Sequence, residues 1–246
     1  MRNYKLETEM RIEFIHGVLT VASANGVVFG NSGGKDCALA GILCKMACSN
    51  TIGIIMPCGT KQNYGSDKTD AERLAEQFDI ESRVVDLTAT RDEILGALVG
   101  ATVPGRPLVS SALSNIPPRL RMTTLYAIAA NENLLVCGTG NRSERHMGYF
   151  TKWGDGGYDF NPIADLTVTE IYEFLRYLNA PESIIGKAPS AGLFEGQTDE
   201  LDMGVSYAAI DEYLLTGAVN DKDKAIIDKY HKISEHKRKI PAMFSN

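Results

Sequence analysis

The sequence predicts an α/β protein built on a doubly wound parallel sheet with helices on both faces. Short apolar runs alternate along the chain with helical segments of about 10–15 residues, which is typical of βαβ units. The apolar runs are continuous rather than alternating, as strands covered on both faces require. No internal repeat or low-complexity linker divides the chain, so we expect a single domain over residues 1–246.

Hydrophobic spacing and turn residues then predict the elements in order. Leu6, Met10 and Phe14 recur at helical spacing and indicate an N-terminal helix. The next expected elements are strands at 26–30, 52–56, 83–87 and 134–137, and helices at 37–48, 67–78, 90–99 and 119–132. Residues 100–118 hold four prolines and two glycines and are expected to form a loop.

The C-terminal third is expected to add helices as cover on the same sheet. Thr167 and Glu170 have capping-box spacing and predict a helix that runs to about Leu178. A further helix over 206–215 should end at Gly217. From Asp221 onward the sequence predicts one final basic helix.

Composition excludes several classes of protein. With 25 Lys and Arg against 31 Asp and Glu, the net charge of −6 argues against a nucleic-acid binder, although a local cluster of cations can still bind an anionic small molecule. The first 15 residues carry charges throughout, and no apolar run approaches the about 20 residues that span a bilayer. We therefore expect a cytoplasmic protein without membrane contact. Five cysteines without a CxxC pair fit neither a disulfide framework nor a zinc site.

The glycine-rich turn between the first strand and its helix is the main candidate for a ligand site. Doubly wound sheets bind phosphates at this point, where glycines allow close approach and the helix offers free N–H groups. A tight turn without a ligand is the alternative, but Ser32, Gly33, Gly34 and Asp36 together favour a ligand. Neither a Walker A loop nor a GxGxxG pattern is present here. A carboxylate beside phosphates indicates Mg²⁺ between them.

Residues 32–36, SGGKD, resemble the SGGxDS signature of the ATP pyrophosphatases, which cleave ATP between its α and β phosphates. Seven further segments resemble the ammonia-dependent NAD⁺ synthetases, and GYFTKWGDGG at 148–157 is the most specific of them. The others are residues 115–122, 138–144, 159–162, 187–193, 197–200 and 234–238.

This resemblance implies a Rossmann-like fold of the adenine nucleotide α-hydrolase type and a homodimer. It implies a ligase that amidates deamido-NAD⁺ with ammonia. In that family the nicotinate carboxylate attacks the α-phosphate of ATP, pyrophosphate leaves, and ammonia displaces AMP from the acyl adenylate. We expect no fused amidase domain in 246 residues, although an amidase partner chain is conceivable.

The resemblance also assigns roles to individual residues. Asp36 and Glu144 would hold Mg²⁺, and with Lys152 they form the expected catalytic set. The expected ATP-binding residues are Gly30, Asn31, Ser32, Gly33, Gly34, Lys35, Asp36, Cys37, Thr139 and Ser190. The expected contacts to deamido-NAD⁺ are Arg119, Lys152, Asp159, His236 and Lys237.

Two positions depart from the family pattern. Cys37 replaces the usual serine, and a thiol donates a weaker hydrogen bond than a hydroxyl. Val168 stands where the family usually has a lysine on the ATP phosphates, so we expect weaker ATP binding unless Lys35 or another residue compensates.

Purely structural interpretations compete with these assignments. Arg119 and Arg121 could face solvent, Glu144 could simply be an acid in a helix's first turn, and the 221–239 segment, with a local charge of +3, could be a solvated face. Two other functions are considered. The chain could be a tRNA-thiolating or GMP-forming ATP pyrophosphatase, or it could bind adenine nucleotides without catalysis.

Overall fold

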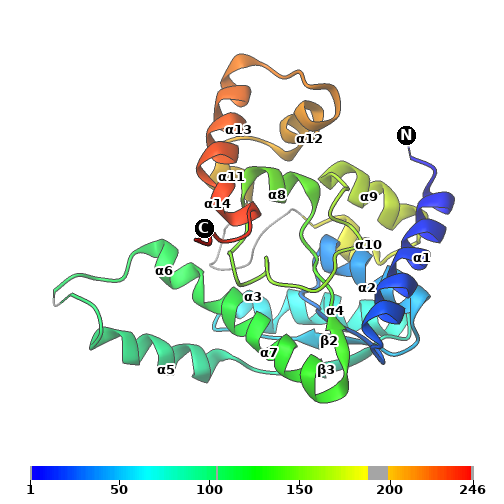
Figure 1. Cartoon of the computed structure of the whole chain (residues 1–246), viewed down its shortest axis with the longest axis horizontal. Helices are drawn as coiled ribbons and strands as arrows, with labels where there is room; N and C mark the ends of the chain where they lie inside the picture. Colours follow the sequence, from blue (N-terminus) through cyan, green and yellow to red (C-terminus); the bar gives the residue numbers. More distant parts are fainter. Residues whose placement is uncertain (1, 104, 188–198, 245–246) are drawn as a thin grey trace.

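The computed structural model describes residues 2–103, 105–187 and 199–244, and one parallel sheet lies at its centre (Figure 1). The strand order is β3-β2-β1-β4. The strands are β1 Gly26–Gly30, β2 Thr51–Ile55, β3 Glu81–Val84 and β4 Leu134–Val136. Val28 of β1 is in register with Ile52 of β2 and Val136 of β4. The predicted parallel α/β fold is therefore confirmed.

Helices account for most of the remaining described chain. Through the first two thirds they are α1 Tyr4–Ala22, α2 Lys35–Ala47, α3 Lys61–Tyr64, α4 Ser66–Gln77, α5 Thr88–Val99, α6 Ser110–Ser114, α7 Ile116–Glu132 and α8 Arg142–Met147. The later helices are α9 Val168–Tyr177, α10 Glu182–Ile185, α11 Asp199–Met203, α12 Tyr207–Thr216, α13 Asp221–Ile233 and α14 Glu235–Arg238.

Alternate residues of β1 point to opposite faces of the sheet, and helices cover both faces. Phe29 packs with Leu39 of α2 and Phe174 of α9 in one buried cluster. Val28 packs on the other face with Leu125 of α7. Both strand residues are fully buried, as continuous apolar strands predict.

Three element predictions need correction. Residues 100–118 are not all loop, because α6 forms there and α7 begins at Ile116 rather than at 119. Prolines at 117 and 118 are compatible with this start, since the first turn of a helix needs no N–H partner. The third strand begins at Glu81, earlier than expected. The final basic helix is broken at Ser234 into α13 and α14.

Of the C-terminal helices, α9 packs in the cluster that covers β1, whereas α12 and α13 do not lie directly on the sheet as expected. Helices α12 and α13 pack against α8 and α9 and stand above the sheet in Figure 1. They share a separate apolar cluster that includes Met147, Val168, Tyr207 and Ile227. The capping box at Thr167 and the glycine stop at Gly217 are confirmed.

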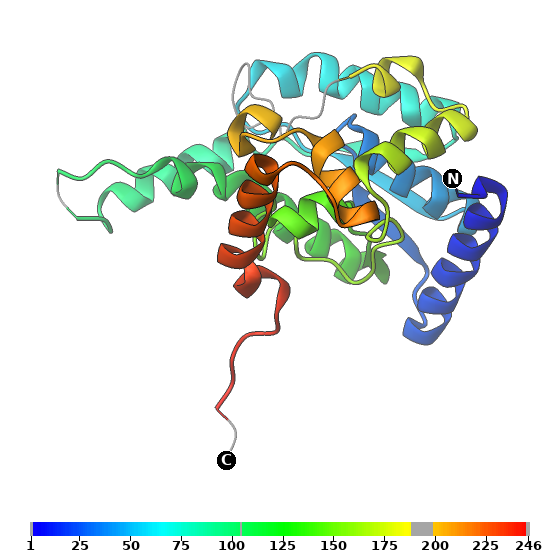
Figure 2. The same ribbon diagram turned by 90° about the horizontal axis from the view of Figure 1, so that it is seen from above.

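Helices α5 and α6 form an arm that extends away from the rest of the chain (Figures 1 and 2). No residue of α5 is buried. Among the described residues, no helix is long and apolar enough to cross a membrane.

Candidate active site

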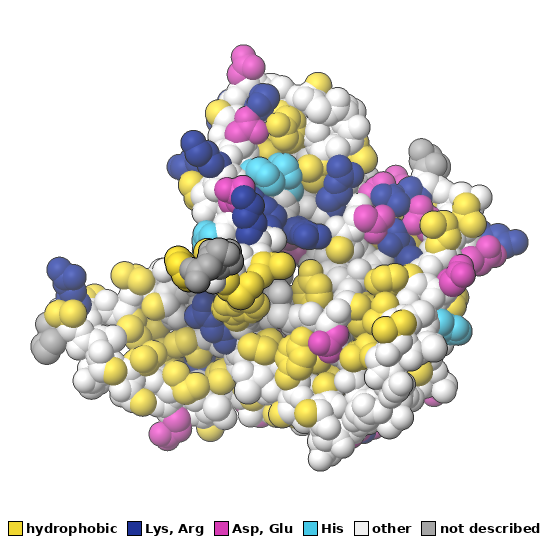
Figure 3. All heavy atoms as spheres, in the orientation of Figure 1, with side chains coloured by type: hydrophobic (Ala, Val, Ile, Leu, Met, Phe, Trp, Pro, Cys, Tyr) yellow, Lys and Arg dark blue, Asp and Glu magenta, His cyan; other side chains and the backbone are white. Residues whose placement is uncertain are grey.

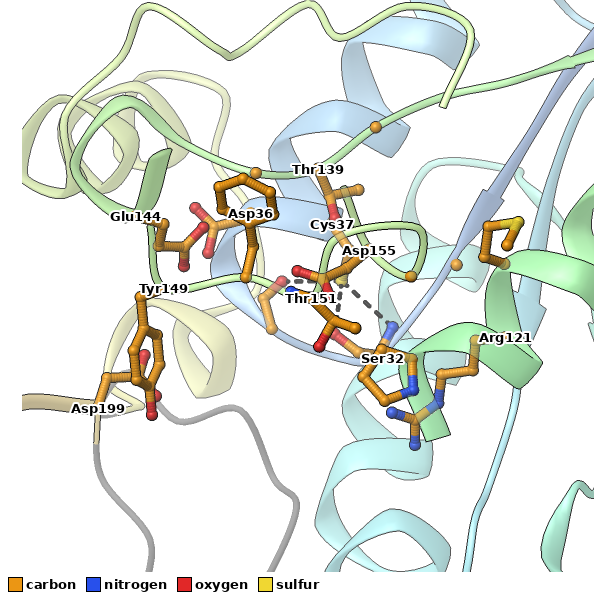
Figure 4. Close-up of a pocket in the computed structure, with 18 of the residues that line it drawn as sticks. Ser32, Asp36, Cys37, Arg121, Thr139, Glu144, Tyr149, Thr151, Asp155 and Asp199 are labelled. Carbon is orange, nitrogen blue, oxygen red and sulfur yellow. Dashed lines mark hydrogen bonds between the residues drawn. The ribbon is translucent and has the colours of Figure 1, made fainter. Parts of the chain in front are cut away.

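A cavity of about 1050 Å³ opens at the carboxyl ends of the strands, the position where doubly wound sheets bind ligands (Figure 4). The glycine-rich loop after β1 and the segment after β4 form part of its lining. Helix α7 contributes to the lining from one side, and α14 contributes from another.

The glycine-rich loop is held in a shape that only glycine allows at Gly33. Its φ is +70°, and a Cβ there would overlap the carbonyl oxygen of Asp67. The buried side chain of Asn31 supports the loop by donating to Ala71 O at 3.0 Å. Helix α2 follows with Gly34 as its N-cap and no side-chain cap. Its first-turn N–H groups therefore suit an anionic ligand.

Cys37 lines the cavity, but its thiol also bonds within the loop. The Sγ accepts from the Ser32 N–H at 3.3 Å, donates to Gly34 O at 3.1 Å and lies 3.2 Å from Ser32 Oγ. Burial raises the pKa of this thiol above its ordinary value. The thiol is therefore a neutral group that holds the loop closed at the helix start.

Asp36 and Glu144 lie at the same end of the cavity (Figure 4). Asn141 connects them. Asn141 Nδ2 donates to Asp36 Oδ1 at 3.0 Å. Asn141 and Glu144 also form the capping box of α8, with each side chain bonded to the other's backbone N–H. Glu144 is thus an acid in the first turn of α8, as the structural interpretation expected, and it also lines the cavity.

One ammonium lies against these two carboxylates. Lys35 Nζ is 2.7 Å from Asp36 Oδ2 and 4.0 Å from Glu144 Oε1. Burial alone would lower the pKa of Lys35, and the two carboxylates raise it above its ordinary value. Burial and the charge of Asp36 raise the pKa of Glu144, and Lys35 opposes that shift.

The donor set at this end fits Mg²⁺ bound together with phosphates. Within the described residues no group of three or more His, Cys, Asp or Glu side chains could hold a metal ion. Two carboxylates alone make an incomplete cage, and Mg²⁺ typically takes its remaining ligands from phosphate oxygens and water. The residues present therefore suit a metal that enters with a nucleotide.

Lys152, His236 and Lys237 come together where the 148–153 segment meets α14. Lys152 Nζ donates to His236 O at 2.7 Å. Lys237 Nζ donates to Gly148 O and Phe150 O, both at 2.7 Å. Burial lowers the pKa of Lys237, with a smaller opposing effect from Asp155. His236 and Lys237 line the cavity, whereas Lys152 does not.

The two arginines of α7 differ in position. Arg119 is exposed and outside the cavity lining, with Nη2 3.4 Å from Lys152 O. Arg121 faces the cavity, donating to Met56 O and to Asn63 Oδ1, each at 3.2 Å. Arg119, which the sequence analysis assigned to the substrate, does not line the cavity, and Arg121, which it did not assign, does.

The structure places the remaining assigned residues differently from one another. Thr139 lines the cavity (Figure 4). Asp159 is outside the lining, and its carboxylate accepts from Val136 N–H at 2.8 Å and Tyr126 OH at 3.0 Å. Ser190 lies outside the described residues. Val168 is buried in the apolar cluster under α12 and α13 and carries no charge toward the site.

The comparisons with known proteins agree with one another. A family model described as NAD synthase matches residues 7–244. The chain is 47% identical over 240 residues to an NH(3)-dependent NAD(+) synthetase of Carboxydothermus hydrogenoformans, covering 97% of each chain. It is 42% identical to the enzyme of the same name from Finegoldia magna, with 98% of this chain and 97% of that one covered.

Two solved structures are similar over the whole chain. The NMN synthetase from Francisella tularensis has a TM-score of 0.93 at 35% identity, with both chains covered completely. The NH3-dependent NAD synthetase from Campylobacter jejuni has a TM-score of 0.78 at 30% identity, again with complete coverage of both.

Proposed function

The chain belongs to the NAD synthase family, and on that premise we propose how its cavity accommodates the two substrates. The enzyme is an ammonia-dependent ligase that amidates deamido-NAD⁺ to NAD⁺. ATP adenylates the nicotinate carboxylate, and ammonia then displaces AMP. The observation that best supports our division of the cavity is the meeting of Asp36 and Glu144 beside the glycine-rich loop.

The ATP end consists of the loop from Gly30 to Cys37 together with Thr139, and Ser190 is proposed to join them. Asp36 and Glu144 hold Mg²⁺, which when bound supplies positive charge to the phosphates as pyrophosphate leaves. The loop and the start of α2 offer backbone N–H groups that are fixed before the reaction begins. Asn141 keeps Asp36 turned toward Glu144.

The cations of the opposite side bind the dinucleotide. Arg119, Arg121, Lys152 and Lys237 make no ion pair with a carboxylate among the described residues, and the contacts described above are to neutral oxygens. An anionic substrate supplies the missing partners. Lys152 is the proposed catalytic cation near the reacting carboxylate. His236 and Asp159 complete the proposed contacts, although Asp159 already accepts two hydrogen bonds.

The α5–α6 arm is the proposed dimer surface. Hydrophobic side chains lie over this arm in Figure 3, and Val99, Val103 and Val109 are 75%, 60% and 65% exposed. Such a patch on an extended arm is typical of a protein contact, and a second copy of this chain is the proposed occupant. Val99→Asp with Val109→Asp should halve the mass measured by light scattering, and an unchanged mass would reject this surface.

A cytoplasmic location is supported by the cysteines. All five are free, including Cys44 and Cys137, whose Sγ atoms are only 3.5 Å apart. Adjacent unbonded thiols fit a reducing compartment. A thiol reagent that cannot cross membranes should label the protein only after the cells are lysed. Labelling in intact cells would contradict this location.

The decisive assay supplies purified protein with deamido-NAD⁺, ATP, Mg²⁺ and ammonium. NAD⁺, AMP and pyrophosphate should form in equal amounts, and glutamine should not replace ammonium. Asp36→Asn and Glu144→Gln should abolish product. Asp79→Asn is the matched control, because the Asp79 side chain is fully exposed. Absence of NAD⁺ with folded wild-type protein would reject the proposal.

Nicotinate mononucleotide is a second candidate substrate. The specific observation is the TM-score of 0.93 to an NMN synthetase, compared with 0.78 and 0.80 to two NAD synthetases. An assay with both substrates at equal concentration measures the ratio of NMN to NAD⁺ formed. That ratio gives the preference directly, because competing substrates are consumed in proportion to their kcat/KM values.

A further inference from the structure

The ammonium of Lys35 lies against the two side chains that are proposed to hold the divalent cation. Its side chain is only 6% exposed, with Asp36 at 2.7 Å and Glu144 at 4.0 Å. The Tyr207 ring lies 5.7 Å from Nζ. Adjacent residues of a helix point in different directions, so helix geometry alone does not bring Lys35 to Asp36. The lysine has to fold back to reach the pair.

Charge balance disfavours an ammonium and a metal ion in the same pair of carboxylates. Lys35 is the only Lys or Arg of the described chain within 4.0 Å of either carboxylate. A divalent cation held by Asp36 and Glu144 would bring three positive charges against the two carboxylates in contact with them. The next carboxylate, Asp199, bonds to Tyr207 rather than to Lys35. Repulsion between like charges is strong where water is excluded. The ammonium therefore has to leave when the metal enters.

The phosphate side of the same cavity is the available destination. Lys35, Ser32 and Gly34 line one continuous space, and a lysine has a flexible stem of four carbons that can redirect its charge. Val168 of α9 has an aliphatic side chain and is buried in the same cluster as Tyr207, so it offers no cation. Lys35 thus supplies a positive charge that α9 does not.

We propose that Lys35 occupies the divalent-cation position of the substrate-free enzyme and moves to the phosphates when metal and ATP bind together. This inference rests on the proposed ATP end of the cavity. The exchange keeps Asp36 and Glu144 in place before substrate arrives. It also makes metal binding depend on ATP, because metal alone has to displace an ammonium that has no phosphate to receive it.

Mn²⁺ binding without nucleotide, followed by electron paramagnetic resonance, tests the exchange. Lys35→Met removes the charge and keeps most of the stem, so it should bind Mn²⁺ about tenfold tighter than wild type, a change typical of removing one close charge. The same variant should show a KM for ATP raised about tenfold, since a charge-assisted phosphate contact is lost. A lysine with a merely structural role would not move these two quantities in opposite directions.

Lys45→Met is the matched control. Lys45 is near the other end of α2, where it contacts Ser49 and Asp79, and neither quantity should change. Folded Lys35→Met that binds Mn²⁺ no tighter than wild type overturns the proposal. Lys35→Gln serves as a second variant.

If neither variant folds alone, saturating Mn²⁺ should restore both, because the metal then replaces the lost ammonium. Failure of Mn²⁺ to restore them would also overturn the exchange. A wild-type protein that makes no NAD⁺ would reject the proposed function while leaving the Mn²⁺ comparison intact, so the two failures are distinguishable.

Discussion

Asn141 donates a 3.0 Å hydrogen bond from its side-chain amide to Asp36, which is 105 residues away in the sequence. The same side chain accepts from the Glu144 N–H at 2.9 Å as the N-cap of α8. One fully buried residue therefore holds both carboxylates of the proposed metal site, since its side-chain amide bonds Asp36 and its backbone N–H donates to Glu144 Oε2 at 3.1 Å. The local fold of a six-residue helix and the geometry of the site depend on the same group.

Asn141 variants can separate these two contributions. Asn141→Ala should lower stability by about 1 kcal/mol through loss of the cap. Asn141→Ser keeps a capping oxygen and should recover most of that stability, but it lacks the donor to Asp36. Both variants should need several-fold more Mg²⁺ for half-maximal NAD⁺ formation. Urea unfolding and Mg²⁺ titration check this, and a Mg²⁺ requirement that followed stability alone would contradict it.

Arg121 should matter more for the dinucleotide than for ATP. It faces the cavity from α7 without a carboxylate partner among the described residues. Arg121→Met should raise KM for deamido-NAD⁺ at least about tenfold, the effect of losing one charge-assisted hydrogen bond. KM for ATP should stay within about twofold by the same reasoning. Arg73→Met, on an exposed face of α4, is the control for initial-rate measurements. Equal increases in both KM values would contradict a contact between Arg121 and deamido-NAD⁺ alone.

Stability should fall in mild acid because of His146. Burial, and then the neighbouring His231, Arg238 and Arg142, lowers its pKa from 6.5 to about 4. Between those two pKa values the unfolded chain binds this proton more readily than the native chain does. The contribution of His146 to the free energy of unfolding is therefore fully present above pH 6.5 and is lost as pH falls toward 4.

Urea midpoints between pH 7.5 and pH 5 measure this loss. His146→Leu should flatten the dependence by less than about 1.4 kcal/mol per pH unit, the limit for a single proton. His16→Gln, on α1, is the control variant. A profile that His146→Leu leaves as steep as wild type would assign the loss to other groups.

The glycine-rich loop was predictable because all its signals are local: a strand end, adjacent glycines and an acid. Glu144 was assigned through the family resemblance, and its meeting with Asp36 was expected since strands of a parallel sheet bring their following loops together. The break at Ser234 was not, because it depends on tertiary contacts. Ser234 Oγ donates to Met147 O at 3.5 Å, and a Cβ on Gly148 would overlap Ser234. No local pattern in the 221–239 segment records that contact.

The position of Arg121 in the cavity lining was not predictable for a related reason. Which arginine faces the cavity depends on the rotation of α7, and α7 starts earlier than the sequence prediction placed it. Positions two apart on a helix point to nearly opposite sides. Val168 is a third example. The sequence shows that a lysine is missing at this position, but it does not show that the valine packs in an apolar cluster.

Cys37 stands at the end of the loop signature, where the family usually has serine. The residue is 3% exposed, and its thiol makes hydrogen bonds to Ser32 and Gly34 that a hydroxyl would make more strongly. Cys37→Ser should lower KM for ATP about two- to fivefold, the effect of about 0.5–1 kcal/mol in one hydrogen bond, and Cys37→Ala should raise it. Cys48→Ser, at the far end of α2, should change nothing in the same initial-rate assay. If serine left KM for ATP unchanged while alanine lowered only stability, the thiol would serve the loop alone and would not meet the nucleotide.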